Sequence, residues 1–285
     1  METLVFGGDE RNLYLYEMLK EEIKDVRLTG FSAYETKYVE NTVDTAEAIN
    51  GADIIIGPIP FSKGQLINTP WNREQVKIKD FFSAARSGQT LLGGRLSRDA
   101  LTLAQENGVR TVDILECEGL EVLNAIPTAE GAIQIAMENT KITIHSSNIL
   151  VMGFGRIGKI LCKTLRGLGA NVYALARKQS DLSFIAAYGY EGVTLNSLPG
   201  ILGNMDIIIN TIPNVILDKD NISYLNKRVL IIELASKPFG VDIEESRKAG
   251  LNVLFAPSLP GKAAPLTSAR YIRKAIDNIF RDTVD

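Results

Sequence analysis

Short apolar runs alternate along the whole chain with segments whose apolar positions recur every three to four residues. Leu4-Val5-Phe6 is typical of a buried strand. The segment that follows places Leu15, Leu19 and Ile23 on one face of a helix. This alternation of strand and helix predicts parallel sheets covered by helices.

The first part of the chain holds several more elements of this kind. Further strands are expected at 26–28, 54–56 and 90–92, and helices at 80–86 and from Ser97 to just before Gly108. We expect these elements to form a first domain, residues 1–123, on the substrate side of the molecule.

The second part repeats the alternation with longer apolar runs. A helix is predicted over 128–139, after Pro127, where it would join two domains. Strands follow at 149–152, 172–176, 206–210, 229–234 and 253–256, with helices at 157–168 and 266–280. We expect a dinucleotide-binding domain over residues 124–285, whose last helix packs back toward the first. The predicted fold class is α/β, with two doubly wound parallel-sheet (Rossmann-like) domains and an interdomain cleft.

Composition narrows the classes of protein to consider. The 285 residues carry a formal net charge of −3, and 45% of them are hydrophobic, as in ordinary globular proteins. A nucleic-acid binder would show a basic excess, and a membrane span needs about 20 apolar residues in a row. Cys117 and Cys162 lack the spacing of a metal site. Since the N-terminus shows no signal peptide, we expect a cytoplasmic protein without metal, nucleic acid or membrane partners.

The most informative motif is a GxGxxG sequence, residues 153–158, between a predicted strand and helix. Gly153 would permit the tight turn, Gly155 would let a pyrophosphate approach the backbone, and Gly158 would let the helix pack on the sheet. The amino end of the helix would then hold the phosphates. This context predicts a dinucleotide site.

The end of the next strand bears on the choice of dinucleotide. NAD enzymes place an acidic residue there for the ribose hydroxyl, whereas this chain has Arg177, 19 residues beyond Gly158, followed by Lys178. A guanidinium can bind a 2′-phosphate with two hydrogen bonds, and Ser180 can add a third. The pattern favours NADP, with NAD as the alternative if these are ordinary solvated cations.

Later strands end at the same edge of the predicted sheet. The turn 210–213 should border the cofactor, and the segments 233–237 and 256–262, which end two later strands, should face the same cleft. The cofactor residues expected from all these patterns are Gly153, Phe154, Gly155, Arg156, Ile157, Gly158, Ala176, Arg177, Lys178, Ser180, Thr211, Ile212, Pro213 and Leu234.

Candidate catalytic groups are harder to choose. Many dehydrogenases that act on 2-hydroxy acids use a late histidine, but the single histidine, His145, precedes the dinucleotide motif. No GxSxG motif supports a serine nucleophile. Cations that follow strand ends would instead suit an anionic substrate with more than one carboxylate. The residues that follow strand ends or line the expected cleft are Asp9, Arg11, Arg95, Thr128, Glu130, Ser236, Lys237, Ser258 and Lys262.

Several motifs together resemble a known family. The segment 124–131, the GxGxxG motif, 210–213, 234–238 and 259–265 occur in the order and spacing of the A subunits of dipicolinate synthase from spore-forming bacteria. The resemblance is strongest from Asn124 to about Ala269. The loops 236–242 and 260–268 also resemble those of alanine dehydrogenases.

The resemblance implies a reaction and a partner. A cyclic, partly reduced pyridine dicarboxylate from the lysine pathway would be oxidised to dipicolinate in the mother cell during sporulation, beside a flavoprotein B subunit. Because the ring becomes aromatic, orientation of the ring and neutralisation of its carboxylates would matter more than a strong base. We assign substrate binding to Asp9, Arg11, Arg95, Thr128 and Lys237, and catalysis to Glu130, Ser236 and Lys262. We also expect a homo-oligomer.

Two other functions remain open on the sequence. One is an alanine-dehydrogenase-like or 2-hydroxy-acid dehydrogenase, which turnover of pyruvate would reveal. The other is a non-catalytic NADP(H)-sensing protein, which would bind the dinucleotide tightly without turning over a cyclic dicarboxylate.

Overall fold

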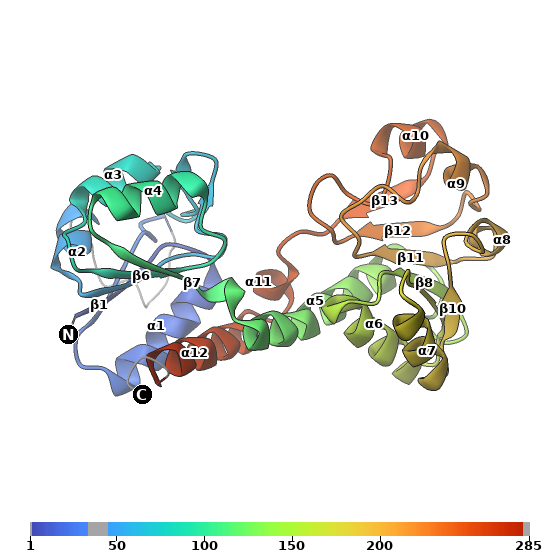
Figure 1. Ribbon diagram of the computed structural model, residues 1–285, viewed down its shortest axis with the longest axis horizontal. Coiled ribbons are helices and arrows are strands. Elements are labelled where there is room, and N and C mark those ends of the chain that lie inside the picture. The colour runs from blue at the N-terminus through green and yellow to red at the C-terminus, as the bar shows by residue number, and fades with distance from the viewer. Residues whose placement is uncertain (1, 34–44, 282–285) are drawn as a thin grey trace. The chain divides into compact units, whose positions relative to one another are not determined.

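The computed structural model describes residues 2–33 and 45–281 (Figure 1). Its contacts divide the chain into two compact units, one of residues 1–123 and 265–285 and one of residues 124–264. Among the described helices, none has both the length and the apolar character needed to cross a membrane.

The first unit is built on a parallel five-stranded sheet in the order β2-β1-β3-β6-β7. Its strands are β1 (Thr3–Phe6), β2 (Val26–Thr29), β3 (Ile54–Ile56), β6 (Thr90–Gly93) and β7 (Arg110–Asp113). A short antiparallel hairpin of β4 (Ser62–Lys63) and β5 (Leu66–Ile67) follows β3. In this order the strands are added first on one side of β1 and then, from β3 onward, on its other side. α/β sheets bind ligands at such a switch point, here between β1 and β3.

Helices cover both faces of this sheet because side chains of a strand alternate between faces. Leu4 and Phe6 pack in one core, with residues of α2 (Thr45–Gly51), α3 (Ile78–Ala84) and α4 (Arg98–Glu106). Val5 lies in the other core, with residues of α1 (Glu10–Glu22) and α12 (Pro265–Arg281). The short 3-10 helix Ile114–Glu116 follows β7.

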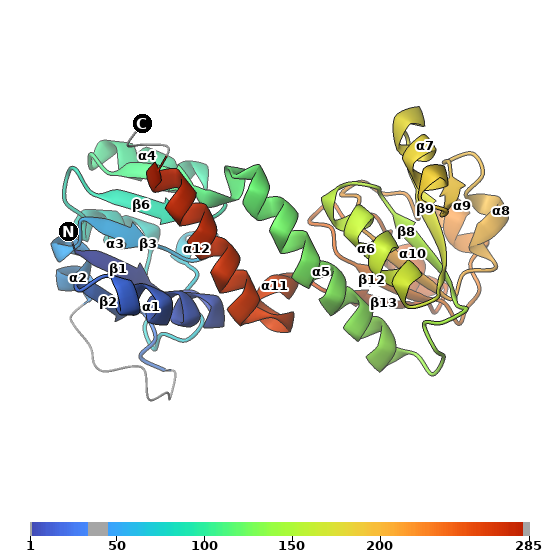
Figure 2. The same cartoon turned by 90° about the horizontal axis from the view of Figure 1, so that it is seen from below.

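The C-terminal helix α12 belongs to this first unit, whereas the sequence places it in the second domain. It lies along α1 (Figure 2). Ile272 and Ile276 bury their side chains in the core that α1 shares. Arg273 adds an ion pair to Glu22, with 2.6 Å between Nη2 and Oε2. The apolar stripe of α12 therefore has its partner surface far away in the sequence.

The second unit contains a parallel six-stranded sheet in the order β10-β9-β8-β11-β12-β13. These strands are β8 (Asn148–Met152), β9 (Asn171–Leu175), β10 (Glu191–Val193), β11 (Ile207–Asn210), β12 (Leu230–Glu233) and β13 (Asn252–Phe255). This is the order of dinucleotide-binding folds, which reverses between β8 and β11. The prediction of two doubly wound Rossmann-like domains is confirmed.

The apolar strands of this sheet are buried on both faces. Ile149 and Val151 share one core with α5 (Glu118–Asn139), α6 (Arg156–Gly167) and α7 (Gln179–Ala187). Leu150 and Met152 share the other core with α8 (Pro199–Leu202) and α9 (Lys219–Ser223). The remaining helices of the unit are α10 (Ile243–Lys248) and α11 (Leu259–Ala263).

Helix α5 begins earlier than the sequence suggests. It starts at Glu118 and continues through Pro127, the residue after which the sequence pattern predicts its start. A proline inside a helix removes one intrahelical hydrogen bond. Buried side chains on both sides of it, Leu120 and Ala129, anchor the two halves in apolar cores. The free energy gained from this packing outweighs the cost of the hydrogen bond lost at Pro127.

Candidate active site

The glycine-rich loop connects β8 to α6 at the point where the strand order reverses. Gly153 has a φ of +101°, in the region that favours glycine. A Cβ at Gly158 would overlap the carbonyl oxygen of Gly153. Both glycines are therefore required by the protein itself, for the turn and for the approach of helix to strand.

Gly155 differs from its two neighbours. It precedes α6 with an ordinary φ of −82°. Within the described part of the chain, no atom of a residue beyond its two chain neighbours lies within 4 Å of the Cβ position at Gly155. The first turn of α6 has no acidic residue, and Gly155 has no side chain to cap it. This open cradle at a helix N-terminus fits a pyrophosphate, because first-turn N–H groups have no intrahelical acceptor.

The neighbouring strand β11 ends in a turn that packs on this loop. Thr211 Oγ1 donates to the carbonyl oxygen of Met152 at 2.8 Å. Thr211 and Ile212 also provide the atoms nearest to the Cβ position of Gly153. Pro213 is exposed just beyond them. The turn 211–213 thus borders the glycine-rich loop.

The end of β9 presents positive charge. Ala176 is buried, while Arg177, Lys178 and Ser180 are exposed around the start of α7. Lys178 precedes that helix and makes no side-chain hydrogen bond to its first turn. Asp181 lies within the first turn. Two exposed cations and the carboxylate of Asp181 thus lie together around the N-terminus of α7.

Two buried polar side chains, Asn210 and Glu233, lie in segments that the sequence directs toward the cofactor, but the sequence assigns neither of them a role. Glu233 ends β12 and Asn210 ends β11, and the two residues are paired in register. Glu233 Oε1 accepts from Asn210 Nδ2 at 2.7 Å and from the Ala235 N–H at 2.8 Å. Oε2 accepts from the Gly240 N–H at 2.9 Å. The signal in the sequence is a polar residue closing each of two adjacent apolar strands.

Burial raises the pKa of Glu233, and its hydrogen bonds with Asn210 and with the backbone of Gly240, Ala235 and Val241 oppose that shift. A raised pKa means that the folded chain binds this proton more tightly than the unfolded chain does. Ionisation of Glu233 therefore lowers the stability of the folded state. The contribution of the Glu233 side chain to the free energy of unfolding falls as pH rises from the ordinary glutamate pKa through the raised one.

We expect this effect to appear in the variant Glu233→Gln. The free energy of unfolding of the wild type minus that of the variant should fall as pH rises through that window, because the variant has no proton to lose. Urea titrations of both proteins at several pH values measure the difference. A difference that rises with pH would contradict the assignment.

In the first unit, two predicted residues form an ion pair between a buried guanidinium and a partly buried carboxylate. Arg11 is buried, and its guanidinium makes two bonds of 2.8 Å to the carboxylate of Asp9. Its Nη2 also donates to the carbonyl oxygen of Ile59 at 2.7 Å. Asp9 additionally caps α1 through the Arg11 N–H. The pair lies after β1, next to the loop that follows β3, at the reversal point of the sheet.

Loss of this pair should be costly. Asp9→Ala removes a helix cap and leaves a buried guanidinium without its carboxylate, so we expect the free energy of unfolding to fall by about 2–4 kcal/mol. Urea unfolding measures this change. Asp80→Ala, at an exposed carboxylate in the first turn of α3, serves as the control and should change stability by about 0.5 kcal/mol or less. Equal effects would show that the pair contributes little.

The other predicted residues are spread over several elements. Arg95 is exposed after β6 with a φ of +54°, and its N–H donates to Asp113. Ser236 and Lys237 are exposed in the loop after β12. Ser258, also exposed, precedes α11.

Helix α5 carries two of the candidates. Thr128 Oγ1 donates to the Asn124 carbonyl oxygen at 2.7 Å, and Glu130 is exposed. The next residue, Gly131, lies against Leu259 and Ala263 of α11. This contact places exposed Lys262 on a helix that packs on α5.

His145 and the cysteines take no part in the site. The His145 ring is exposed and hydrogen-bonds through Nδ1 to Ser146 Oγ at 2.9 Å, before β8 begins. Burial raises the pKa of Cys162 to about 12, so this thiol stays protonated. Among the residues placed by the structure, no group of three or more His, Cys, Asp and Glu side chains could hold a metal ion.

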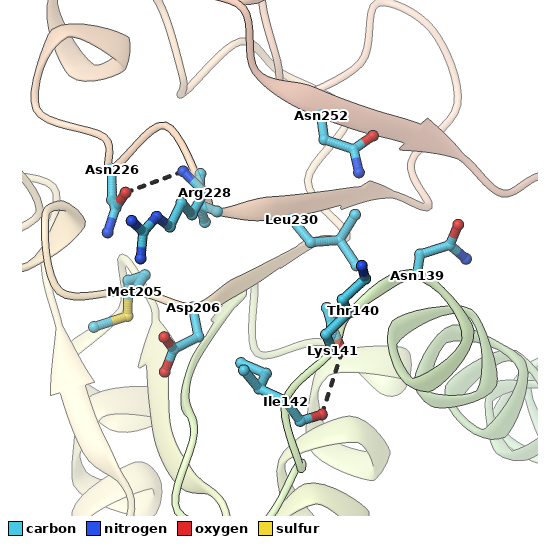
Figure 3. A pocket seen from close by; sticks show the side chains of 11 residues that line it. Asn139, Thr140, Lys141, Ile142, Met205, Asp206, Asn226, Arg228, Leu230 and Asn252 are labelled. Atoms are coloured by element: carbon cyan, nitrogen blue, oxygen red, sulfur yellow. Dashed lines mark hydrogen bonds between the residues drawn. The ribbon is translucent and has the colours of Figure 1, made fainter.

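A pocket of about 400 Å³ lies at the amino ends of the strands of the second sheet, opposite the ends that carry the glycine-rich loop (Figure 3). It is lined by Asp206 before β11, by Leu230 and Asn252 at the starts of β12 and β13, and by Lys141 beyond the end of α5. Dinucleotides bind at the carboxyl ends of parallel strands. This pocket is therefore separate from the site around the glycine-rich loop.

Comparisons with known proteins decide the family. The family of the N-terminal domain of the dipicolinate synthase A subunit matches residues 2–115, and the NAD-binding domain of the D-isomer specific 2-hydroxyacid dehydrogenases matches residues 127–236. The dipicolinate synthase A subunit of Bacillus subtilis (strain 168) is 31% identical over 99% of this chain and 96% of that protein. The chain belongs to the family of dipicolinate synthase A subunits.

Solved structures agree with this membership. The A chain of dipicolinate synthase from Bacillus subtilis superposes with a TM-score of 0.86 at 30% identity, covering 99% of this chain and 96% of that one. An L-alanine dehydrogenase, at 12% identity and a TM-score of 0.67 over 96% of this chain and 87% of that one, shares the fold alone. The resemblance seen in the sequence to dipicolinate synthase A subunits is confirmed.

Membership of this family also gives the class of chemistry. The chain is an NAD(P)-dependent oxidoreductase with a nicotinamide-cofactor domain. The matched NAD-binding region spans the glycine-rich loop, the end of β9, the turn 211–213 and Leu234. The matched N-terminal region includes Asp9, Arg11 and Arg95.

Proposed function

We propose that this chain is an NADP-dependent oxidoreductase that converts a cyclic, partly reduced pyridine dicarboxylate to dipicolinate. The observation that carries the proposal is the 31% identity to a dipicolinate synthase A subunit over 99% of the chain. The open cradle at Gly155 supports the cofactor half of the proposal, because it leaves room for a pyrophosphate at the start of α6.

The preference for NADP over NAD rests on the end of β9. Arg177 and Lys178 stand where NAD enzymes carry an acidic residue for the ribose hydroxyl. Both side chains are exposed next to the N-terminus of α7, and Ser180 lies within the first turn of that helix. Together they would hold a 2′-phosphate by charge, by guanidinium hydrogen bonds and by one hydroxyl group.

Bound NADP supplies a nicotinamide ring that accepts a hydride. The chain's part is to orient the dicarboxylate ring, neutralise its carboxylates and accept the proton that leaves as the ring becomes aromatic. A substrate with a 4-hydroxyl group must also lose that group as water, so that loss of one water, one hydride and one proton gives dipicolinate. We assign carboxylate binding to Arg11, Arg95 and Lys237, with Asp9 orienting Arg11 and Thr128 contributing its hydroxyl group to the substrate site. Glu130 or Ser236 would take the proton, directly or through water, and Lys262 would stabilise developing negative charge.

The biological setting follows from the family. We propose that the enzyme works in the cytoplasm of the mother cell during sporulation, on a branch of the lysine pathway. The Bacillus subtilis relative is designated an A subunit, which supports a flavoprotein B subunit of dipicolinate synthase as the partner of this chain. We also expect a homo-oligomer.

The test of substrate class compares three reactions in one set of assays. In the first reaction the chain receives freshly generated 4-hydroxy-tetrahydrodipicolinate with either NADP⁺ or NAD⁺. In the second it receives pyruvate with NADPH, and in the third pyruvate with NADPH and ammonia. We expect turnover of the cyclic dicarboxylate, faster with NADP⁺ than with NAD⁺. Turnover of pyruvate in its place would identify an alanine- or 2-hydroxy-acid dehydrogenase. Tight NADPH binding without any turnover would leave two explanations, an obligate partner subunit or a sensing protein.

A further inference from the structure

The buried carboxylate of Glu233 connects two loops at the cofactor edge of the second sheet. Through Ala235 and Gly240 it binds both ends of the loop 235–240, which carries Ser236 and Lys237. Through Asn210 it binds the end of β11. One side chain therefore holds segments from two adjacent strands.

Asn210 connects this hydrogen-bond network to the turn that packs on the glycine-rich loop. Its side chain accepts from the Ile212 N–H at 3.1 Å and donates to the Ile212 carbonyl oxygen at 3.0 Å, closing the turn that follows β11. Thr211 in that turn donates to Met152, directly before Gly153. Hydrogen bonds, together with the backbone of the turn 210–212, thus connect the loop 235–240 to the start of the glycine-rich loop.

The space around Asn210 leaves little freedom for other arrangements. A Cβ at Gly240 would overlap the Asn210 side-chain amide. The carbonyl oxygen of Gly240 also accepts from the N–H groups of Ile216 and Leu217, each at 2.9 Å. The loop 235–240 is therefore closely packed against the end of β11, and Glu233 lies between them.

We propose that Glu233 is a positioning residue for the oxidoreductase reaction, which holds the turn 211–213 and the loop 235–240 in register with the nicotinamide end of the cofactor. The proposal rests on the proposed function. It assigns no contact between Glu233 and the cofactor or substrate, since the carboxylate acts through Asn210 and backbone N–H groups.

The charge and shape of Glu233 can be separated by one substitution. An ionised carboxylate has acceptors alone, and both of its oxygens face N–H donors here. Glu233→Gln keeps the shape but turns an NH₂ group toward one of these donors. One hydrogen bond is then lost and a donor is left buried without an acceptor, which loosens one of the two loops.

The experiment measures binding of two probes and steady-state kinetics in the intact chain. 2′,5′-ADP tests the phosphate and adenosine end of the site, and NADPH tests the whole site. For Glu233→Gln we expect the Kd of 2′,5′-ADP to stay within about twofold of the wild type and the Kd of NADPH to rise about tenfold, the latter from a loss of about 1.4 kcal/mol. We also expect kcat with the cyclic dicarboxylate to fall about tenfold, because misplaced groups impair the transition state more than binding.

Two further variants keep the test falsifiable. Gly240→Ala displaces Asn210 while leaving the carboxylate in place, and should show the same split between the two probes. Glu191→Gln makes the same chemical change at an exposed position of β10 and should match the wild type.

Equal weakening of both probes by Glu233→Gln would show a merely structural role and overturn the proposal, and so would unchanged NADPH binding and kcat. A wild-type chain that binds neither probe would instead refute the proposed NADP-dependent function, and the positioning role with it.

Discussion

Gly155→Ala should fold like the wild type and lose most of its affinity for NADPH. The φ of Gly155 suits any residue, and its Cβ position lies in open space among the described residues, so the methyl group costs the apo protein little. When the cofactor binds, the same methyl group stands where the pyrophosphate must approach the backbone. We expect the Kd of NADPH to rise about 100-fold, a loss of about 2.7 kcal/mol.

Fluorescence titration with NADPH and a thermal unfolding curve measure the two halves of this prediction. Gly167→Ala is the matched control, because Gly167 lies in the same helix α6 and its Cβ position is also open within the described part of the chain. It should bind like the wild type. Gly158→Ala is less informative, since it disturbs the loop itself. Normal NADPH binding by Gly155→Ala would place the cofactor elsewhere.

Arg177→Asp should separate the two nicotinamide dinucleotides. The substitution removes a guanidinium that can form two hydrogen bonds with a 2′-phosphate and adds a carboxylate that repels it. We expect the Kd of NADPH to rise about 100-fold, as two such losses of about 1.4 kcal/mol would give, while the Kd of NADH stays the same or falls.

The control for charge alone is Arg228→Asp. Arg228 is exposed just before β12, at the amino ends of the strands of the same sheet, and lines the pocket in Figure 3. This variant should leave both affinities within about twofold, since exposed charges far from a site are largely screened by salt. An equal loss of affinity for NADPH and NADH in Arg177→Asp would contradict the assignment of the 2′-phosphate site.

The sequence predicts the parts of this fold in which local pattern and tertiary packing agree. The apolar run 149–152 is a central strand buried on both faces, and the GxGxxG motif follows it at the reversal point. Strand β7 escapes prediction because it lies at the edge of its sheet, is partly exposed and has Val112 as its one apolar residue. The predicted start of α5 is wrong because tertiary packing overrides the local signal of Pro127.

The candidate site is predicted less completely than the fold. The sequence marks Arg11 as a strand-end cation, but long-range packing, which periodicity does not reveal, buries it against Asp9 and Ile59. The sequence places Glu233 and Asn210 in segments that face the cofactor, but the roles of their side chains escape prediction for a related reason. Their importance arises from the register of β11 with β12 and from a loop that returns to both.

The measurement that tests the central claim most directly uses this chain alone. It is supplied with NADP⁺ and freshly generated 4-hydroxy-tetrahydrodipicolinate, and the formation of dipicolinate and of NADPH is followed in the same reaction. We expect the two products to appear together in equal amounts. NADP⁺ binding without any formation of dipicolinate would contradict the claim that this chain carries out the hydride transfer.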